Sequence, residues 1–169
     1  MATQRIDLLV VCTGNICRSP TAEGVLRHKA VARGLAGRVH VLSAGTHAYH
    51  VGEAPDPRTV RHARSRGYDL SAQRAMQLAE RHYREFDYIL AMDRGHLGAL
   101  RTLAPKDGKA RLGMFLEASS RWRGEDVPDP YYGGAEGFEQ VLDMVEEAAE
   151  RWLERFEAQF DPARYRLQG

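Results

Sequence analysis

A cysteine and an arginine near the start of the chain have the spacing and the neighbours that phosphoryl transfer requires. Five residues separate Cys12 from Arg18, and the pair Ser19-Pro20 that follows is typical of a helix start. A helix N-terminus offers free N–H groups and the positive end of a dipole, which bind anions and favour the thiolate form of a cysteine. A thiolate beneath a bound phosphate is a nucleophile aimed at phosphorus, so Cys12 is the candidate nucleophile.

The residues between these two side chains can form a cradle for the phosphate. Gly14 permits an unusual backbone angle and Asn15 tolerates a left-handed one, so that successive N–H groups can turn inward. The planar guanidinium of Arg18 can hold two phosphate oxygens at once. Ser19 is placed to donate a hydrogen bond to the thiolate and to help it leave in a second step. The expected phosphate-binding residues are Thr13, Gly14, Asn15, Ile16, Cys17 and Arg18.

A phosphocysteine mechanism also needs a general acid for the leaving oxygen, on a separate loop that can close over the phosphate. Asp129 fits this requirement, since it stands between two prolines in a loop rich in Gly, Pro and charge. Tyr131 and Tyr132 follow, and aromatic walls suit an aromatic leaving group. The alternative for Asp129 is a simple turn, because Asp-Pro is a common turn pair.

The chain has only two cysteines, Cys12 and Cys17. Two cysteines form neither a secreted disulfide framework nor a four-thiolate zinc site. For Cys17 two interpretations stay open. Its side chain can simply pack in the core while its N–H serves the phosphate, or it can trap an oxidised Cys12 as a disulfide.

Size and composition indicate one ordinary domain. The chain has 169 residues, of which 43% are hydrophobic and 28% are charged. We expect a single domain over residues 1–160 and a C-terminal tail over 161–169. The net charge of +1 argues against recruitment of nucleic acid or an anionic membrane surface. No apolar run approaches the roughly 20 residues of a membrane span, and the N-terminus lacks a signal-peptide pattern, so we expect a cytoplasmic protein.

Strand-like and helix-like segments alternate along the chain, which predicts an α/β domain with a mostly parallel sheet. The predicted strands lie at residues 6–11, 38–43, 87–92 and 110–116. The first predicted helix begins with Ser19 as N-cap and Pro20 at its first position. The next three cover residues 56–66, 76–82 and 93–103, with Asp56 and Asp93 as N-caps, and the last is a long helix around an apolar stripe from Phe138 to Phe156. Ligands of such sheets bind outside the carboxyl ends of the strands, where the Cys12 loop lies.

Two further groups of side chains have simple interpretations. The seven histidines show no spacing typical of a metal site, and we interpret them as surface or polar-network residues. Four arginines share the helix predicted at 56–66, and they indicate a solvated face or a docking patch for acidic substrate segments. These arginines are Arg58, Arg61, Arg64 and Arg66.

The chain resembles the low-molecular-weight protein tyrosine phosphatases. Residues 10–23 match the family signature, and the segment Asp129-Pro130-Tyr131-Tyr132-Gly133 begins 117 residues after Cys12 (129 − 12). Residues 43–46, 55–58 and 86–90 also match family segments in order, so the resemblance covers nearly the whole chain. It implies Cys12 as nucleophile, Arg18 as phosphate binder and Asp129 as general acid.

The resemblance also implies the surroundings of the site. It predicts a four-stranded parallel sheet flanked by helices on both faces, with the phosphate-binding loop between the first strand and the first helix. Asn15, Ser19 and Ser43 are then expected to form a network that fixes this loop. Tyr49, Tyr131 and Tyr132 are expected to line the cleft entrance. The family needs no metal and no cofactor.

One departure from the family concerns the loop network. Many relatives have a histidine where this chain has Gln73, and that histidine joins the network of Asn15. Glutamine can also form hydrogen bonds, so we expect Gln73 to adjust the phosphate-binding loop without abolishing activity.

The leading hypothesis is hydrolysis of phosphotyrosine in proteins, by a monomer. A bacterial tyrosine kinase is one candidate partner. Alternatives are a phosphoarginine phosphatase, an arsenate reductase of the same fold and a non-catalytic phosphotyrosine-binding module. The apolar Ile16 favours a phenyl ring over arginine, where relatives specific for phosphoarginine have threonine.

Overall fold

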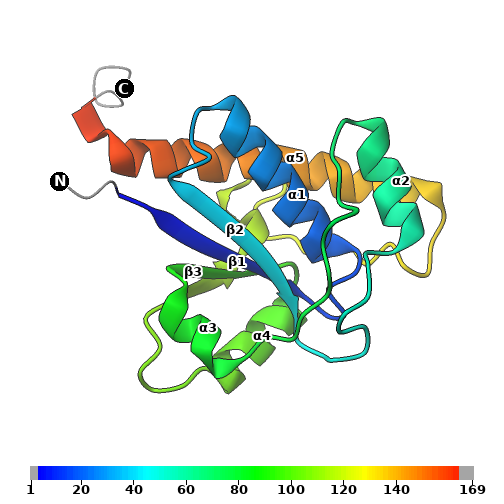
Figure 1. Cartoon of the computed structure of the whole chain (residues 1–169), viewed down its shortest axis with the longest axis horizontal. Coiled ribbons are helices and arrows are strands. Elements are labelled where there is room, and N and C mark those ends of the chain that lie inside the picture. The colour runs from blue at the N-terminus through cyan, green and yellow to red at the C-terminus, as the bar shows by residue number, and fades with distance from the viewer. Residues whose placement is uncertain (1–3, 164–169) are drawn as a thin grey trace.

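The computed structural model describes residues 4–163, and residues 1–3 and 164–169 are not described. The last six residues of the tail expected over 161–169 therefore lie outside the described residues. Strands and helices alternate as the sequence predicts (Figure 1). In chain order the elements are β1 (Ile6–Cys12), α1 (Arg18–Ala32), β2 (Val39–Gly45), α2 (Pro57–Ser65), α3 (Glu80–Glu85), β3 (Tyr88–Ala91), α4 (Arg94–Leu103), β4 (Arg111–Met114), the 3₁₀ helix η1 (Phe115–Ala118) and α5 (Ala135–Phe160).

Within the described residues, one sheet of four parallel strands has the order β2-β1-β3-β4. The chain passes from β1 to β2 on one side and then to β3 on the other side of β1. Such a reversal opens a crevice at the carboxyl ends of the two inner strands. Cys12 is the last residue of β1 and pairs with Gly45, so the candidate nucleophile lies at this crevice.

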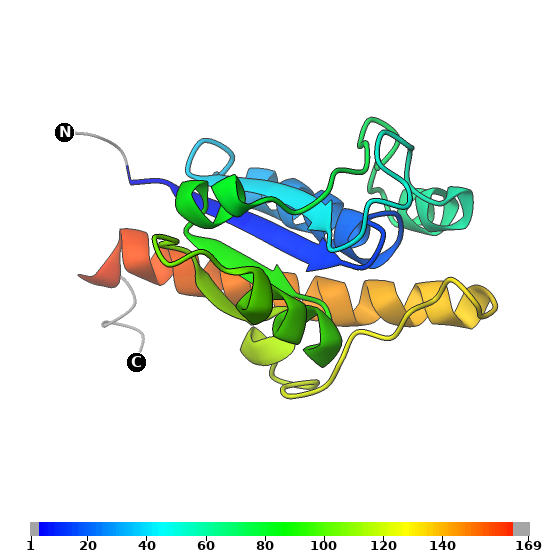
Figure 2. The same cartoon turned by 90° about the horizontal axis from the view of Figure 1, so that it is seen from below.

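Alternate side chains of β1 enter two separate hydrophobic cores. Leu8 and Val10 pack with residues of α1 and α5, whereas Leu9 and Val11 pack with residues of α3 and α4. This alternation is the period of a strand that is buried on both faces. Figures 1 and 2 show the resulting layers, with α1 and α5 covering one face of the sheet and α3 and α4 the other.

Two local predictions are wrong. The helix expected at 76–82 begins only at Glu80, because the preceding residues pair with the end of β2: Gly45 N–H donates to Met76 O, and Leu78 N–H donates to Gly45 O. The N-cap expected at Ser19 is also wrong, since α1 already starts at Arg18. The N-caps Asp56 and Asp93 are confirmed, as both carboxylates accept from N–H groups of the first turn.

The arginines of α2 do not form one solvated face. Arg66 is paired with Glu139, Asp143 and Glu146 and so ties α2 to α5. Arg58 is bound to the carboxylate of Asp56. Within residues 4–163, no helix has the length and the apolar character needed to cross a membrane.

Candidate active site

The phosphate loop, residues 12–18, is held open by its surroundings. Three of its carbonyl oxygens accept hydrogen bonds from N–H groups outside the loop. Cys12 O accepts from Thr46 at 2.9 Å, Thr13 O from His47 at 3.0 Å and Ile16 O from Asp56 at 2.9 Å. The C=O and N–H of a trans peptide point in opposite directions, so the N–H groups that follow these carbonyls point into the loop. This arrangement is the inward-facing nest of N–H groups that the sequence predicts.

Asn15 gives the loop its shape. It has φ = 59° and is the one non-glycine residue with positive φ among the described residues. Asparagine tolerates this left-handed conformation better than most residues. Its side-chain Oδ1 accepts from Met76 N–H at 3.0 Å, which fixes the orientation of the amide. Its Nδ2 then donates to Ser19 Oγ at 2.8 Å and to Ser43 Oγ at 2.9 Å.

The expected network of Asn15, Ser19 and Ser43 is therefore present, and it ends on Cys12. Ser19 Oγ lies 2.9 Å from Cys12 Sγ, and Cys12 is 3% exposed. Because Ser19 accepts from Asn15, its own proton is free to point at the sulfur. At the far end, Ser43 donates to the buried Glu23 at 2.8 Å. Burial raises the pKa of Glu23.

Gln73 does not join this network, so that expectation is wrong. Its Nε2 donates to Pro20 O at 3.0 Å. The backbone N–H of Met76 provides the partner that Asn15 Oδ1 needs. The network is thus completed by a main-chain group, and a main-chain donor leaves no trace in the sequence.

Arg18 is buried beneath the loop and held from several sides. Its Nη1 donates to Asp93 Oδ2 at 2.8 Å and to Val127 O at 2.9 Å. Burial raises the pKa of Asp93, but the His96 N–H, the Arg18 guanidinium and the other local charges outweigh it and hold that pKa below its usual value. The sequence predicts only a capping role for Asp93, which its Oδ1 fulfils, whereas its Oδ2 also fixes Arg18.

His96, on α4, is a site residue that sequence analysis did not single out. Its Nε2 lies 2.7 Å from Thr13 Oγ1 and 3.5 Å from Arg18 Nη2. Arginine can only donate, so the contact with Arg18 places the lone pair on Nε2 and the proton on Nδ1. Nδ1 lies 3.2 Å from Asp93 Oδ1 and forms no hydrogen bond among the described residues. Burial and the neighbouring Arg18 lower the pKa of His96 to about 4. The neutral imidazole therefore joins the start of the phosphate loop to its arginine.

Asp129 lies across a cavity of about 190 Å³ from the phosphate loop. One carboxylate oxygen accepts from Tyr131 N–H at 3.0 Å, which is the turn that the alternative interpretation predicts. The other oxygen is 3.9 Å from Arg18 Nη2. The side chain is 42% exposed, so it forms the turn and also reaches the cavity. The cavity is lined by Cys12, Thr13, Gly14, Ile16, Cys17, Arg18, Tyr49, His50, Asp129, Tyr131 and Tyr132.

Three tyrosines stand at the mouth of this cavity, as the sequence predicts. Tyr132 and Tyr49 are 89% and 70% exposed, and Tyr131 packs edge-on against Tyr132 with ring centroids 5.0 Å apart. His47 stacks on Tyr49. His50 also lines the cavity, whereas the sequence predicts only a surface or polar-network role for it. Exposed aromatic rings around a small anion site suit a phosphorylated ring that enters from solvent.

The family model of the low molecular weight phosphotyrosine protein phosphatases matches residues 7–161. The chain belongs to this family. A low molecular weight protein-tyrosine-phosphatase of Streptomyces coelicolor is 46% identical over 142 residues, which cover 82% of this chain and 86% of the relative. The crystal structure of a protein tyrosine phosphatase from Entamoeba histolytica superposes with a TM-score of 0.87 at 35% identity, and the match covers 91% of this chain and 98% of the other. A drosophila arginine phosphatase superposes with a TM-score of 0.83 at 30% identity, over 88% and 96% of the two chains.

Cys17 is buried in this family member, at 5% exposure. Burial raises the pKa of its thiol to about 12. The thiol is therefore protonated at neutral pH, and a protonated thiol is a poor nucleophile and a poor metal ligand. This property favours the packing interpretation of Cys17 over the redox interpretation. The described residues contain no group of three or more His, Cys, Asp or Glu side chains that could hold a metal ion.

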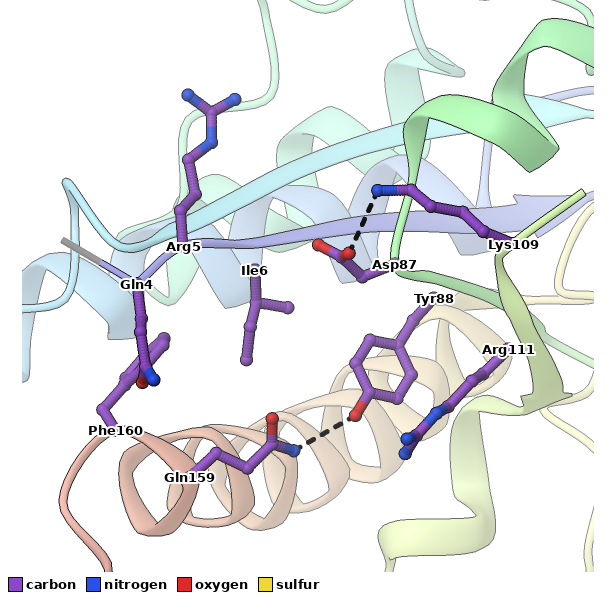
Figure 3. Close-up of a pocket in the computed structure, with 9 residues that line it drawn as sticks. All are labelled: Gln4, Arg5, Ile6, Asp87, Tyr88, Lys109, Arg111, Gln159 and Phe160. Atoms are coloured by element: carbon purple, nitrogen blue, oxygen red, sulfur yellow. Dashed lines mark hydrogen bonds and ion pairs between the residues drawn. The ribbon is translucent and has the colours of Figure 1, made fainter. Parts of the chain in front are cut away.

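A larger cavity of about 400 Å³ lies at the opposite end of the sheet (Figure 3). Two pairs of its side chains bind each other: Lys109 pairs with Asp87, and Gln159 donates to the hydroxyl of Tyr88. Among the described residues that line it, no cysteine, serine or histidine offers a nucleophile or base. The smaller cavity at Cys12 is therefore the candidate active site.

Proposed function

We propose that this protein is a protein-tyrosine phosphatase that acts through a phosphocysteine on Cys12. The observation that carries this proposal is the convergence of three side chains on one cavity: Cys12 at its base, Arg18 beside the loop and Asp129 across from both. The inward N–H groups of the phosphate loop and the guanidinium of Arg18 would bind the three non-bridging oxygens of the phosphate. They would also stabilise the charge that these oxygens carry in the transition state.

In the first step, the thiolate of Cys12 attacks phosphorus, the P–O bond to the tyrosine ring breaks, and the protonated Asp129 gives its proton to the departing phenol oxygen. In the second step, Asp129 takes a proton from a water molecule that attacks phosphorus. The P–S bond breaks, Cys12 leaves as a thiolate, and inorganic phosphate is released. Ser19 stabilises this thiolate through its hydroxyl.

The shape and the lining of the cavity favour phosphotyrosine over phosphoarginine. Ile16 presents an apolar side chain to the cavity, and the mouth is formed by Tyr49, Tyr131 and Tyr132. Such walls pack against a phenyl ring but leave the remaining N–H groups of a phosphoguanidinium without partners. We propose that the substrate is a tyrosine-phosphorylated protein, with a bacterial tyrosine kinase as one candidate, and that a cytoplasmic monomer performs the reaction without a metal.

A rate panel in the presence of a metal chelator tests this proposal. It compares peptides that carry phosphotyrosine, phosphoserine and phosphoarginine, with Cys12→Ser as control. We expect fast release from phosphotyrosine alone. Cys12→Ser should abolish turnover and still bind vanadate, because the cradle is made of backbone N–H groups. A preference for phosphoarginine would instead identify the protein as a phosphoarginine phosphatase. Turnover by Cys12→Ser would refute the assignment of Cys12 as nucleophile.

A further inference from the structure

Asp129 stands between two carbonyl groups that are each held by an arginine. We define the acid loop as residues 127–134. Two residues before Asp129, the carbonyl of Val127 accepts from Arg18 Nη1 at 2.9 Å. Two residues after it, the carbonyl of Tyr131 accepts from Arg58 Nη2 at 3.0 Å. Arg18 belongs to the phosphate site, whereas the described residues that line the cavity do not include Arg58.

Arg58 is itself fixed to the support of the phosphate loop. Its Nε and Nη2 donate to the two carboxylate oxygens of Asp56 at 3.2 and 3.0 Å, which is the bidentate geometry of a strong arginine–carboxylate pair. The backbone N–H of Asp56 donates to Ile16 O at 2.9 Å. A continuous path of hydrogen bonds therefore runs from the phosphate loop through Asp56 and Arg58 to Tyr131.

Two aromatic rings add to this attachment. The guanidinium carbon of Arg58 lies 5.3 Å from the ring centroid of Tyr131 and 4.9 Å from that of Phe138. Both distances are within the range of about 6 Å in which a cation is attracted to an aromatic face. Tyr131 is in the acid loop and Phe138 is in the first turns of α5 that follow it. Arg58 thus contacts both the acid loop and the helix that follows it.

The attachment reaches the acid through a single residue. The N–H of Tyr131 donates to Asp129 Oδ1 and sets the direction of this half-exposed carboxylate. The carbonyl of the same Tyr131 is the group that Arg58 holds. A displacement of Tyr131 would therefore turn the carboxylate of Asp129 away from the leaving oxygen, while the cradle and Cys12 would stay in place.

We propose that Arg58 is a positioning residue for the general acid. Through its bonds to Asp56 and Tyr131, it holds Asp129 in a fixed position relative to the phosphate loop. This inference rests on the proposed function, because it assigns Arg58 a role only through Asp129. Its consequence is specific. Loss of Arg58 should slow formation of the phosphocysteine, which kcat/KM measures, only for leaving groups that need a proton. A general loss of folded protein would lower kcat/KM for all substrates alike.

The test compares two aryl phosphates, phenyl phosphate with a poor leaving group and 2,4-dinitrophenyl phosphate with a good one. Arg58→Gln removes the charge and the fork, and Arg58→Lys keeps the charge without the fork. Arg61→Gln is the matched control, since Arg61 is on the same helix, is exposed, and within residues 4–163 makes no hydrogen bond or ion pair. Asp129→Asn gives the full effect of losing the acid. Inhibition by vanadate reports on the cradle in every variant.

We expect Arg58→Gln to lower kcat/KM for phenyl phosphate roughly tenfold, which is part of the 10²–10⁴-fold that a general acid contributes. The loss for 2,4-dinitrophenyl phosphate should be less than about twofold, and vanadate inhibition should be unchanged. For phenyl phosphate, the kcat/KM of Arg58→Lys should fall between those of Arg58→Gln and the native chain, and the kcat/KM of Arg61→Gln should match that of the native chain.

Two results would overturn different parts of this reasoning. Suppose that Asp129→Asn lowers kcat/KM much more for phenyl phosphate than for 2,4-dinitrophenyl phosphate. If Arg58→Gln then lowers kcat/KM equally for both substrates, or for neither, Arg58 does not position the acid. If Asp129→Asn itself lowers kcat/KM equally for both substrates, Asp129 is not the general acid and the proposed mechanism fails, whatever Arg58 does. An Arg58→Gln chain with weakened vanadate inhibition would place the role of Arg58 in the phosphate loop instead.

Discussion

Removing the hydroxyl of Ser19 should expose how much the thiolate depends on one hydrogen bond. Ser19 Oγ has two acceptors within reach of its proton, Cys12 Sγ at 2.9 Å and Ala44 O at 3.5 Å. Since Asn15 donates to Ser19 at 2.8 Å, the Ser19 proton is directed at the closer acceptor, the sulfur. The variant Ser19→Ala deletes this bond and leaves the backbone of α1 unchanged.

The size of the effect follows from the charge on the sulfur. A hydrogen bond to a charged group contributes about 1.5–3 kcal/mol, and each 1.36 kcal/mol of barrier is about tenfold in rate. The bond matters most when Cys12 leaves as a thiolate from phosphorus. Ser19→Ala should therefore slow hydrolysis of the phosphocysteine by about 10- to 150-fold and should slow its formation less.

Rapid mixing with an aryl phosphate measures both steps. We expect Ser19→Ala to release a fast burst of about one phenol per enzyme molecule, followed by slow turnover, because the phosphocysteine accumulates. Thr21→Val is the matched control: it removes a buried hydroxyl of the same helix that bonds to Cys17 O, away from the sulfur. Ser19→Ala with native kcat and no burst would refute the direction that we assign to the Ser19 proton.

Two further predictions concern buried titratable groups. The folded pKa of His96, about 4, lies below its unfolded value, so the unfolded chain binds more protons between these values and stability falls as the pH drops from 7 to 5. This one group accounts for about 2 kcal/mol over that range; His96→Asn should show a correspondingly smaller loss of unfolding free energy in denaturant titrations at pH 7 and 5, and an equal loss would contradict the assignment. Cys17→Ser should keep kcat within about twofold of the native chain, because the protonated thiol takes no part in phosphoryl transfer. If thiol treatment restores the native chain after peroxide and does not restore Cys17→Ser, the redox interpretation of Cys17 is the right one.

The parts of the site that depend on local backbone chemistry could be predicted from the sequence. The left-handed Asn15, the loop between a strand and a helix N-terminus, and the caps at Asp56 and Asp93 each follow from residue type and position. The same holds for the alternating faces of β1, where a period of two assigns side chains to two cores. These features are encoded within a few residues of one another.

The parts that depend on contacts between distant segments could not. His96 reaches Thr13 across 83 residues, and nothing near His96 in the sequence distinguishes it from the other histidines. The segment at 76–79 has helical patterning, but its backbone pairs with Gly45 and Asn15 instead. The prediction for Gln73 was wrong for the same reason, because the partner of Asn15 is the main-chain N–H of Met76.

The strand order explains how an acid so far along the chain reaches the nucleophile. Because β3 lies next to β1, the residue after β3, Met92, follows the edge where Cys12 ends, and its N–H donates to Val11 O. Met92 O then accepts from Val127 N–H at 2.9 Å, and Val127 O accepts from Arg18. The start of the acid loop is thus fixed by the sheet itself. The residues that follow Asp129 are not next to a strand. There the hydrogen bond from Arg58 to Tyr131 O holds the acid loop in place of bonds to the sheet.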